Sequence, residues 1–124
     1  MLHFGKVKDI QIDAGIVGGI SAGKEICEYA ENRNVQYVNH TFTSHLQLSA
    51  SLQAYAGSLK STFAEFPMQL KSLAWDITKN HIVKDDNGCI INPLAVGHGI
   101  IINEDALKQY KVDVEIYINS KKAF

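Results

Sequence analysis

Three side chains that can handle protons each stand at or near the end of a short apolar stretch: Asp13, His40 and Glu65. A carboxylate that accepts the Nδ1 proton of an imidazole fixes its tautomer and leaves Nε2 free to take or return a proton. A carboxyl group kept protonated by its surroundings can donate a hydrogen bond to an oxygen that gains charge. The three residues are therefore candidates for an acid–base dyad, Asp13 and His40, and for a hydrogen-bond donor, Glu65.

The segments before these residues have the pattern of short strands joined by helices. Residues 7–13 place apolar side chains among polar ones and lead into a glycine cluster, which predicts a strand and a tight turn. Ser21 is a plausible N-cap for a helix that ends near Asn32 or Arg33. Residues 35–38 (VQYV) predict a second short strand, which ends at Asn39 and His40.

The next two elements repeat this order. Residues 45–55 are predicted to be a helix capped by Thr43 or Ser44, although their alternating apolar positions would also suit a strand. Residues 61–66 (STFAEF) predict a third strand, stopped by Pro67. The order β-α-β-α-β with short links favours parallel strands with right-handed helical crossovers. Neighbouring strands lie about 4.8 Å apart, so a carboxylate and an imidazole that end adjacent strands can share a hydrogen bond.

After Pro67 the pattern changes to short segments of other kinds. Residues 82–84 and 89–91 flank Asp85-Asp86-Asn87-Gly88, which predicts a hairpin in which Asn-Gly takes positive φ at both turn positions. Asn103 can cap a short helix over residues 104–110, and residues 112–118 alternate as a final strand. We therefore expect one partial α/β domain, with β/α units over residues 1–66 and a closing segment over residues 67–124.

Each candidate residue also has a simpler interpretation. Asp13 could be only a turn-forming residue before Gly15, and Glu65 only a carboxylate at the end of a strand. His45 competes with His40 as the base, but it would begin a helix and point less directly toward the strand ends. We prefer His40, and a contact of His45 rather than His40 with Asp13 would reverse that choice.

Composition excludes several classes of function. The 124 residues are 46% hydrophobic and 20% charged with a net charge of -1, so no basic field favours nucleic acid or anionic lipid. No apolar run approaches the roughly 20 residues that span a bilayer. Cys27 and Cys89 are far apart and lack a CxxC motif, so we expect two buried thiols in a reducing, cytoplasmic compartment.

Most of the chain resembles the C-terminal part of enolase-superfamily barrels of the mandelate racemase kind. The resemblance follows the family's order and similar spacing. It lies in the segments Asp13-Ala-Gly-Ile-Val-Gly-Gly-Ile-Ser21, Val38-Asn39-His40, Ser49-Ala50-Ser51-Leu52, Phe63-Ala64-Glu65-Phe66, Pro93 with Gly97-His98-Gly99-Ile100, and residues 112–118. It implies strands six to eight of a (β/α)₈ TIM-type barrel, about three β/α units, followed by a β-hairpin and a C-terminal strand of the capping domain.

The resemblance also implies a chemistry. In that family a proton α to a carboxylate is abstracted and the enolate is held by Mg²⁺, in sugar-acid dehydratases, racemases and epimerases. Asp13 and His40 would be the acid–base dyad and Glu65 the electrophilic hydrogen-bond donor. The substrate of the parent enzyme would be a small carboxylate or sugar acid, and whether the reaction is dehydration or racemisation stays open.

The chain departs from the family pattern in one large respect. The family's metal-binding carboxylates end the third, fourth and fifth strands, which would precede this chain, so we expect no Mg²⁺ bound by its own ligands and no activity alone. Three parallel strands cannot close a barrel, which needs eight. One alternative is therefore a non-catalytic fragment that pairs its open strand edges with itself, as a homo-oligomer, or with a complementing chain. Another is a binding module for small carboxylates.

Overall fold

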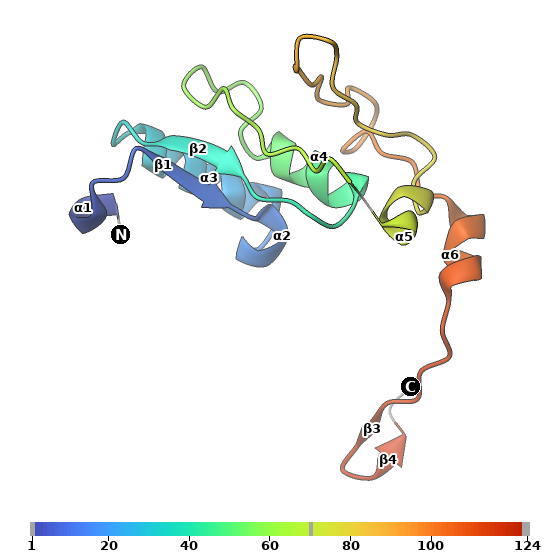
Figure 1. Ribbon diagram of the computed structural model, residues 1–124. Helices are drawn as coiled ribbons and strands as arrows, with labels where there is room; N and C mark the ends of the chain where they lie inside the picture. The colour runs from blue at the N-terminus through green and yellow to red at the C-terminus, as the bar shows by residue number, and fades with distance from the viewer. Residues whose placement is uncertain (1, 70, 123–124) are drawn as a thin grey trace.

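A two-stranded parallel sheet with helices packed against it forms the N-terminal half of the chain (Figure 1). The structure is a computed structural model that describes residues 2–69 and 71–122. Strand β1 (Asp9–Ile12) pairs with β2 (Gln36–Asn39), and α3 (Ile20–Glu31) connects them. This β-α-β unit has the parallel direction that the sequence predicts, and it brings the ends of both strands to one edge.

The remaining elements are short. They are α1 (Leu2–Gly5), α2 (Ala14–Val17), α4 (His45–Gln53), α5 (Ser72–Asp76), α6 (Glu104–Tyr110), β3 (Tyr117–Ile118) and β4 (Lys121–Lys122). The helical prediction for residues 45–55 is confirmed by α4, whose N-cap is Ser44; its Oγ accepts a hydrogen bond from Gln47 N at 3.3 Å. The sequence did not predict α1, α2 or α5.

The start of α3 differs from the prediction. Its N-cap is Gly19 and not Ser21, and no side chain caps it. Gly18 and Gly19 have φ values of 110° and 98°, a backbone conformation that residues other than glycine rarely adopt. The chain needs this pair because α2 ends at Val17 and α3 begins at Ile20, which leaves two residues for a sharp change of direction.

The predicted third strand is wrong as a regular strand. Residues 61–66 form no backbone ladder with β2 and are not a β-strand. Side chains hold the segment beside β2 instead: Tyr37 N donates to Ser61 Oγ at 3.0 Å, and Glu65 N donates to Asn39 Oδ1 at 2.9 Å. In a regular ladder each of these backbone N–H groups would donate to a backbone carbonyl. Here they donate to side chains, so residues 61–66 lie beside β2 without forming a sheet with it.

Two small apolar clusters position these elements. The first joins Cys27, Tyr37 and Ala54, and the second joins Leu48, Leu52 and Ile82. Helix α4 contributes Leu48 and Leu52 to the second cluster, while Ala54, just after its end, belongs to the first. The helix therefore links the sheet to the segment that follows Pro67.

Helices α3 and α4 approach each other closely at Gly23. A Cβ at this position would lie 2.9 Å from the Cβ of Ala54 and 3.3 Å from the hydroxyl of Tyr37. The absence of a side chain at Gly23 therefore sets how near α3 lies to the end of α4 and to β2.

The hairpin prediction for residues 82–91 is confirmed in outline but not in turn type. Lys84 and Ile90 form an antiparallel bridge, and Asp85 N donates to Cys89 O at 2.8 Å. Gly88 has φ 79°, whereas Asn87 has no positive φ. The turn therefore needs only one left-handed residue, the pattern of a three-residue loop closed by glycine. The side chain of Asp85 also stabilises the turn, because its Oδ1 accepts hydrogen bonds from Asn87 N and Cys89 N.

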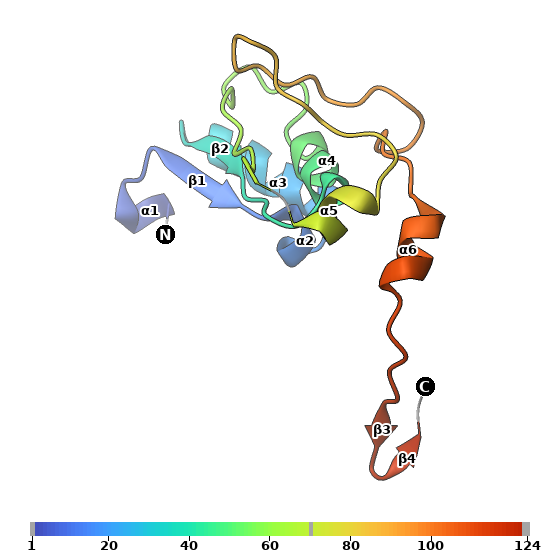
Figure 2. The same ribbon diagram turned by 45° about the vertical axis from the view of Figure 1, so that its right-hand side comes forward.

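The C-terminal part extends away from the sheet and its helices (Figures 1 and 2). Helix α6 is capped by Asn103, as predicted. The predicted strand over residues 112–118 is mostly wrong: only Tyr117–Ile118 is a strand, and it pairs with β4 in a small hairpin. Residues 112–116 are exposed and unpaired in the structure, since no neighbouring strand of the described chain reaches them.

Both cysteines are free thiols, but only Cys27 is buried, so the expectation of a buried Cys89 is wrong. Cys89 lies in the hairpin, where its neighbours leave it exposed. Among residues 2–69 and 71–122 no helix has the length and apolar character needed to cross a membrane.

Candidate active site

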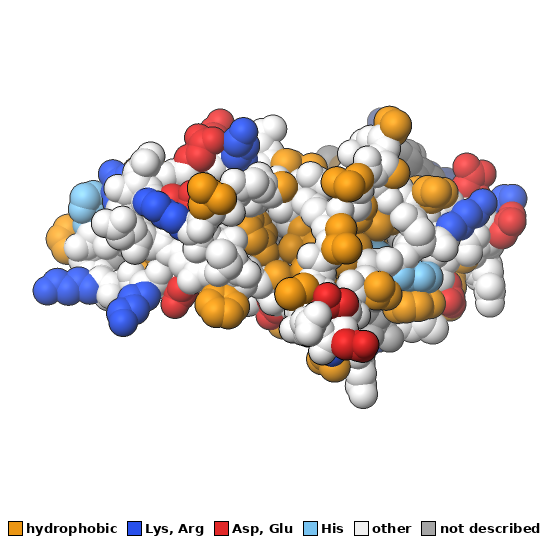
Figure 3. Space-filling model, turned by 90° about the horizontal axis from the view of Figure 1, so that it is seen from above, with side chains coloured by type: hydrophobic (Ala, Val, Ile, Leu, Met, Phe, Trp, Pro, Cys, Tyr) orange, Lys and Arg blue, Asp and Glu red, His pale blue; other side chains and the backbone are white. Residues whose placement is uncertain are grey.

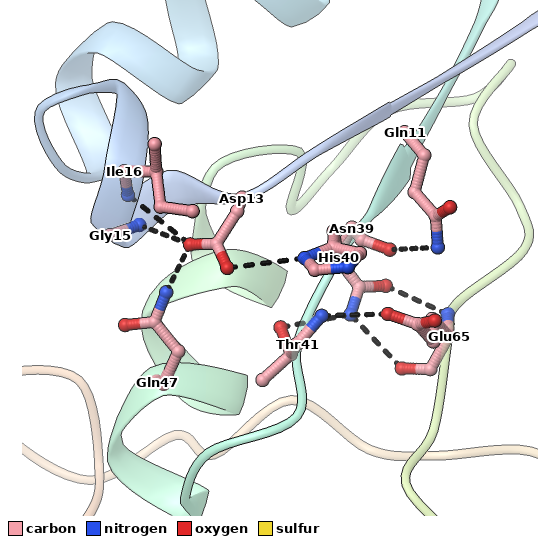
Figure 4. A network of polar contacts seen from close by, with 9 residues as sticks. All are labelled: Gln11, Asp13, Gly15, Ile16, Asn39, His40, Thr41, Gln47 and Glu65. Atoms are coloured by element: carbon pink, nitrogen blue, oxygen red, sulfur yellow. Dashed lines mark hydrogen bonds and ion pairs between the residues drawn. The ribbon is translucent and has the colours of Figure 1, made fainter.

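Asp13 and His40 meet at the ends of β1 and β2. His40 Nδ1 lies 3.3 Å from Asp13 Oδ2 (Figure 4). The pairing of the strands brings them together, because Ile12 is opposite Asn39 and His40 N donates to Ile12 O at 2.9 Å. The residues that follow each strand therefore emerge side by side, and a carboxylate next to Nδ1 is the arrangement that leaves Nε2 as the reactive nitrogen.

The two oxygens of Asp13 have different partners. Oδ1 accepts hydrogen bonds from Gly15 N at 2.8 Å, from Ile16 N at 3.2 Å and from Gln47 Nε2. The first two are the N-cap bonds of α2. Oδ1 therefore has the turn-forming role expected of an Asp before Gly15, while Oδ2 makes the contact with His40. The same carboxylate thus begins a helix and faces an imidazole.

The His40 ring stays accessible while its partner is shielded. The side chain of His40 is 36% exposed and that of Asp13 is 15% exposed. The ring also meets the edge of Phe42, with 4.7 Å between the ring centroids. An imidazole that is held on one side and open on another can reach a molecule outside the chain.

Glu65 lies on the other side of His40 from Asp13 in the view of Figure 4. Its Oε2 accepts a hydrogen bond from Thr41 N at 2.7 Å. Asn39 Nδ2 donates to Glu65 O at 3.0 Å and Glu65 N donates to Asn39 Oδ1 at 2.9 Å. The side-chain amide of Asn39 thus pairs with Glu65 as a backbone peptide of a neighbouring strand would, and this brings the Glu65 carboxyl next to residues 39–41.

A partly buried tyrosine, Tyr55, completes this group. Tyr55 donates from its hydroxyl to Asn39 Oδ1 at 2.9 Å and to Phe63 O at 3.1 Å. Burial, with a further contribution from Tyr37, raises the pKa of Tyr55. The hydroxyl therefore stays protonated and keeps donating at any pH in which the protein works.

His45 occupies a different environment. It is 1% exposed, and its Nδ1 accepts a hydrogen bond from Ile82 N at 3.2 Å. Its ring meets Trp75 and His81 at 5.1 and 4.7 Å between centroids. Burial and the neighbouring His81 lower the pKa of His45. The histidine that contacts Asp13 is thus His40, and His45 is packed in the core.

Comparison with known proteins identifies the family. A family model described as "Enolase C-terminal domain-like" matches residues 1–106. The chain belongs to the enolase superfamily. Its branch is the mandelate racemase/muconate lactonizing enzyme family, in which its solved relatives are classified. A search of curated proteins gave no match.

The solved relatives are all much longer than this chain. A Rhodobacter sphaeroides protein described as a predicted mandelate racemase is 42% identical, with a TM-score of 0.89 over 99% of this chain and 32% of its own. A mandelate racemase/muconate lactonizing enzyme from a Sulfitobacter species is 26% identical, with a TM-score of 0.75 over 88% of this chain and 27% of its own. A Burkholderia xenovorans structure bound to magnesium and fumarate shares the fold, at 19% identity and a TM-score of 0.73 over 84% and 25%.

The chain therefore spans about a third of the length of this enolase-superfamily relative from Rhodobacter. Its open two-stranded sheet matches the C-terminal part of these enzymes, and the barrel is not closed within the chain.

A divalent metal does not fit the residues of this chain that the structure describes. Mg²⁺ requires several oxygen ligands around one point. Within residues 2–69 and 71–122 no group of three or more His, Cys, Asp or Glu side chains could hold a metal ion. The oxygens of Asp13 already contact the N-terminus of α2, Gln47 and His40, and Glu65 Oε2 accepts a hydrogen bond from Thr41 N. Neither carboxylate is therefore arranged with others as a set of metal ligands.

Two residues of the site were not predicted from the sequence, Asn39 and Gln47. The sequence places Asn39 at the end of a strand, within the segment Val38-Asn39-His40, but indicates no role for its side chain, and it indicates no role for Gln47. Asn39 is 0% exposed, a burial that its position before His40 gave no reason to expect. Gln47 is 34 residues from Asp13, and no local pattern links the two.

Proposed function

We propose that this chain carries the acid–base part of an enolase-superfamily active site that abstracts the proton α to a carboxylate, with Asp13 and His40 as the dyad and Glu65 as the hydrogen-bond donor. The contact between His40 Nδ1 and Asp13 Oδ2 carries the proposal. The parent enzyme would act on a small carboxylate or sugar acid in the cytoplasm, as a dehydratase or as a racemase or epimerase.

The roles follow from the chemistry of each group. His40 Nε2 takes the α proton, and the electrons of the broken C–H bond move into the enolate of the substrate. The Asp13 carboxylate stabilises the imidazolium that forms, since it faces Nδ1. The Glu65 carboxyl, whose Oε2 accepts from Thr41 N, is the proposed hydrogen-bond donor to the enolate oxygen. The proton on His40 Nε2 then goes either to a β-hydroxyl, which the enolate expels as water, or back to the α carbon.

The chain alone is inactive in this proposal. In the Burkholderia relative the structure contains magnesium, and Mg²⁺ bound in a parent enzyme would stabilise the charge of the enolate. The described residues of this chain offer no set of ligands for it, so other parts of the fold would have to supply them.

The test places the chain in a complete barrel. Because it matches the Rhodobacter protein over 99% of its length at 42% identity, it can replace the corresponding segment of that protein in a chimera. The assay is exchange of the α proton of small hydroxy acids and sugar acids in D₂O, followed by NMR. We expect exchange in the chimera and a loss of about 10²- to 10⁴-fold in His40→Asn, the usual contribution of a general base.

The control for this experiment is His3→Asn, because His3 is exposed and lies in α1, before β1, whereas Asp13 follows the end of β1. It should leave the exchange rate unchanged, and Asp13→Asn should lower the rate as His40→Asn does. A folded chimera that exchanges protons at the same rate with and without His40 would contradict the proposed roles.

A second candidate function is favoured by the exposed apolar side chains of the chain. Phe4, Leu59, Leu94 and Val96 are 93%, 94%, 92% and 102% exposed. Soluble monomers rarely show many large apolar side chains at such exposure in contiguous patches. In this alternative the chain is a non-catalytic fragment that assembles with itself or with a complementing chain, and its test is the association experiment given in the Discussion.

A further inference from the structure

We infer that Gln47 is a positioning residue of the dyad: it orients the Asp13 carboxylate so that Oδ2 faces His40. The inference rests on the proposed function, since it assigns Gln47 a part in the same acid–base pair. Gln47 lies on α4, an element that carries neither Asp13 nor His40, and its Nε2 donates to Asp13 Oδ1 (Figure 4).

The torsion of an Asp carboxylate is broad, so the carboxylate needs several partners to hold one orientation. Two donors, Gly15 N and Ile16 N, belong to the same turn as Asp13 and move with it. Gln47 Nε2 is the donor that comes from elsewhere in the fold. It ties Oδ1 to α4, and Oδ2 is then the oxygen that remains for His40 Nδ1, at 3.3 Å.

Gly15 leaves the space that this contact needs. A Cβ at Gly15 would lie 2.6 Å from Gln47 Oε1 and 2.8 Å from Gln47 Cδ, closer than real Cβ contacts. Gly15 has no positive φ, so its backbone does not require glycine. The lack of a side chain at this position is therefore explained by the approach of Gln47 and not by the turn.

Helix α4 also offers a matched control. Gln53 is on the same helix and is half-buried like Gln47, but its Nε2 donates to Asn92 Oδ1 at 3.3 Å and to Pro93 O at 3.4 Å. It has the same chemistry and does not contact the dyad. A substitution at Gln53 therefore reports the general cost of removing a glutamine from α4.

The experiment reads the tautomer of His40 in the chain itself, from the ¹⁵N chemical shifts of the imidazole nitrogens at the alkaline end of a pH series, where the shifts no longer change. We expect the Nδ1–H tautomer in the unchanged chain. In Gln47→Met, which keeps the length of the side chain and removes the donor, we expect a shift toward the Nε2–H tautomer. In Gln53→Met we expect no shift.

Gly15→Ala is the second variant, and it displaces Gln47 without changing any donor. It should cause the same shift as Gln47→Met, so the inference stays testable if one of the two variants does not fold. An Nδ1–H tautomer that persists in folded Gln47→Met or Gly15→Ala would overturn the role of Gln47 and leave the dyad intact. An Nε2–H tautomer in the unchanged chain would overturn both the dyad and the inference built on it.

Discussion

At the scale of residues, two histidines five positions apart have opposite environments. His40 follows β2, is partly exposed and faces a carboxylate, whereas His45 begins α4, is buried and accepts a hydrogen bond from a backbone N–H. An imidazole next to an anion is suited to carry a proton, and an imidazole in an apolar core is suited to stay neutral. Position in the fold, rather than residue type, therefore separates the candidate base from the structural histidine.

This difference predicts a pH dependence of stability. Burial, with a smaller effect of His81, lowers the pKa of His45 below its ordinary value of 6.5. Below that pH the unfolded chain binds more protons than the folded chain, so the free energy of unfolding should decrease as the pH falls, by at most about 1.4 kcal/mol per pH unit from this residue. Urea unfolding at pH values between about 8 and 5.5 measures it.

The variant His45→Phe should weaken this pH dependence, because it removes the group that must take up the proton. His3→Asn, at an exposed position, should retain it. Equal slopes in the unchanged chain and in His45→Phe would show that another group is responsible.

At the scale of elements, the unusual feature is a segment held to a strand by side chains. Residues 61–66 lie beside β2 through Ser61, which accepts from Tyr37 N, and through Asn39, which pairs with both backbone groups of Glu65. Ser61 in turn donates to Glu31 Oε1 at 2.7 Å, so the end of α3 also holds this segment. The position of Glu65 thus depends on a few polar side chains instead of a continuous ladder.

Removing Asn39 should therefore release this segment. In Asn39→Ala the backbone N–H and C=O of Glu65 lose their side-chain partner, while the hydroxyl of Tyr55 keeps Phe63 O as an acceptor; unpaired polar groups cost about 1–3 kcal/mol each when they are buried. We expect a loss of about 3 kcal/mol in the free energy of unfolding and faster hydrogen exchange at the Glu65 amide. Urea unfolding and amide exchange by NMR measure the two effects.

Asn92→Ala is the matched control for this prediction, because the described partner of that side chain is one donor, Gln53 Nε2 at 3.3 Å. It should cost about 1 kcal/mol or less. A loss in Asn39→Ala no larger than that in Asn92→Ala would contradict the proposal that Asn39 holds residues 61–66 beside β2.

At the scale of the whole molecule, the chain leaves apolar surface and one strand edge uncovered. In the described residues β1 pairs only with β2, so its other edge is open. Figure 3 shows hydrophobic side chains gathered along the middle of one face. An open strand edge and exposed apolar side chains each favour pairing with another chain.

We therefore expect the chain to self-associate as its concentration rises, measured by sedimentation velocity. Lys8 O and Ile12 O are acceptors for β2, so with the period of a strand the backbone of Asp9 and Gln11 faces the open edge. Asp9→Pro removes an N–H from that edge at the first residue of the strand, where proline is tolerated, and should shift the chain toward the monomer.

Lys24→Gln, on the exposed side of α3, is the control and should associate as the unchanged chain does. A monomer at all concentrations would count against the assembling alternative.

Much of the fold is predicted by local patterns in the sequence. The strands β1 and β2, the helices α3 and α4, the hairpin and the cap of α6 follow from apolar spacing, glycines and capping residues, which act over a few positions. The candidates Asp13, His40 and Glu65 stand at or near the ends of short apolar stretches, and that position is again a local feature of the sequence.

The tertiary structure decided what local patterns leave open. Residues 61–66 have the composition of a strand, but Ser61 and Asn39 take the backbone groups that a ladder would use, so they do not form one. Gln47 became a partner of Asp13 only because α4 packs next to the end of β1. Such contacts join residues far apart in sequence, and they depend on how several elements pack together, which no short stretch of sequence records.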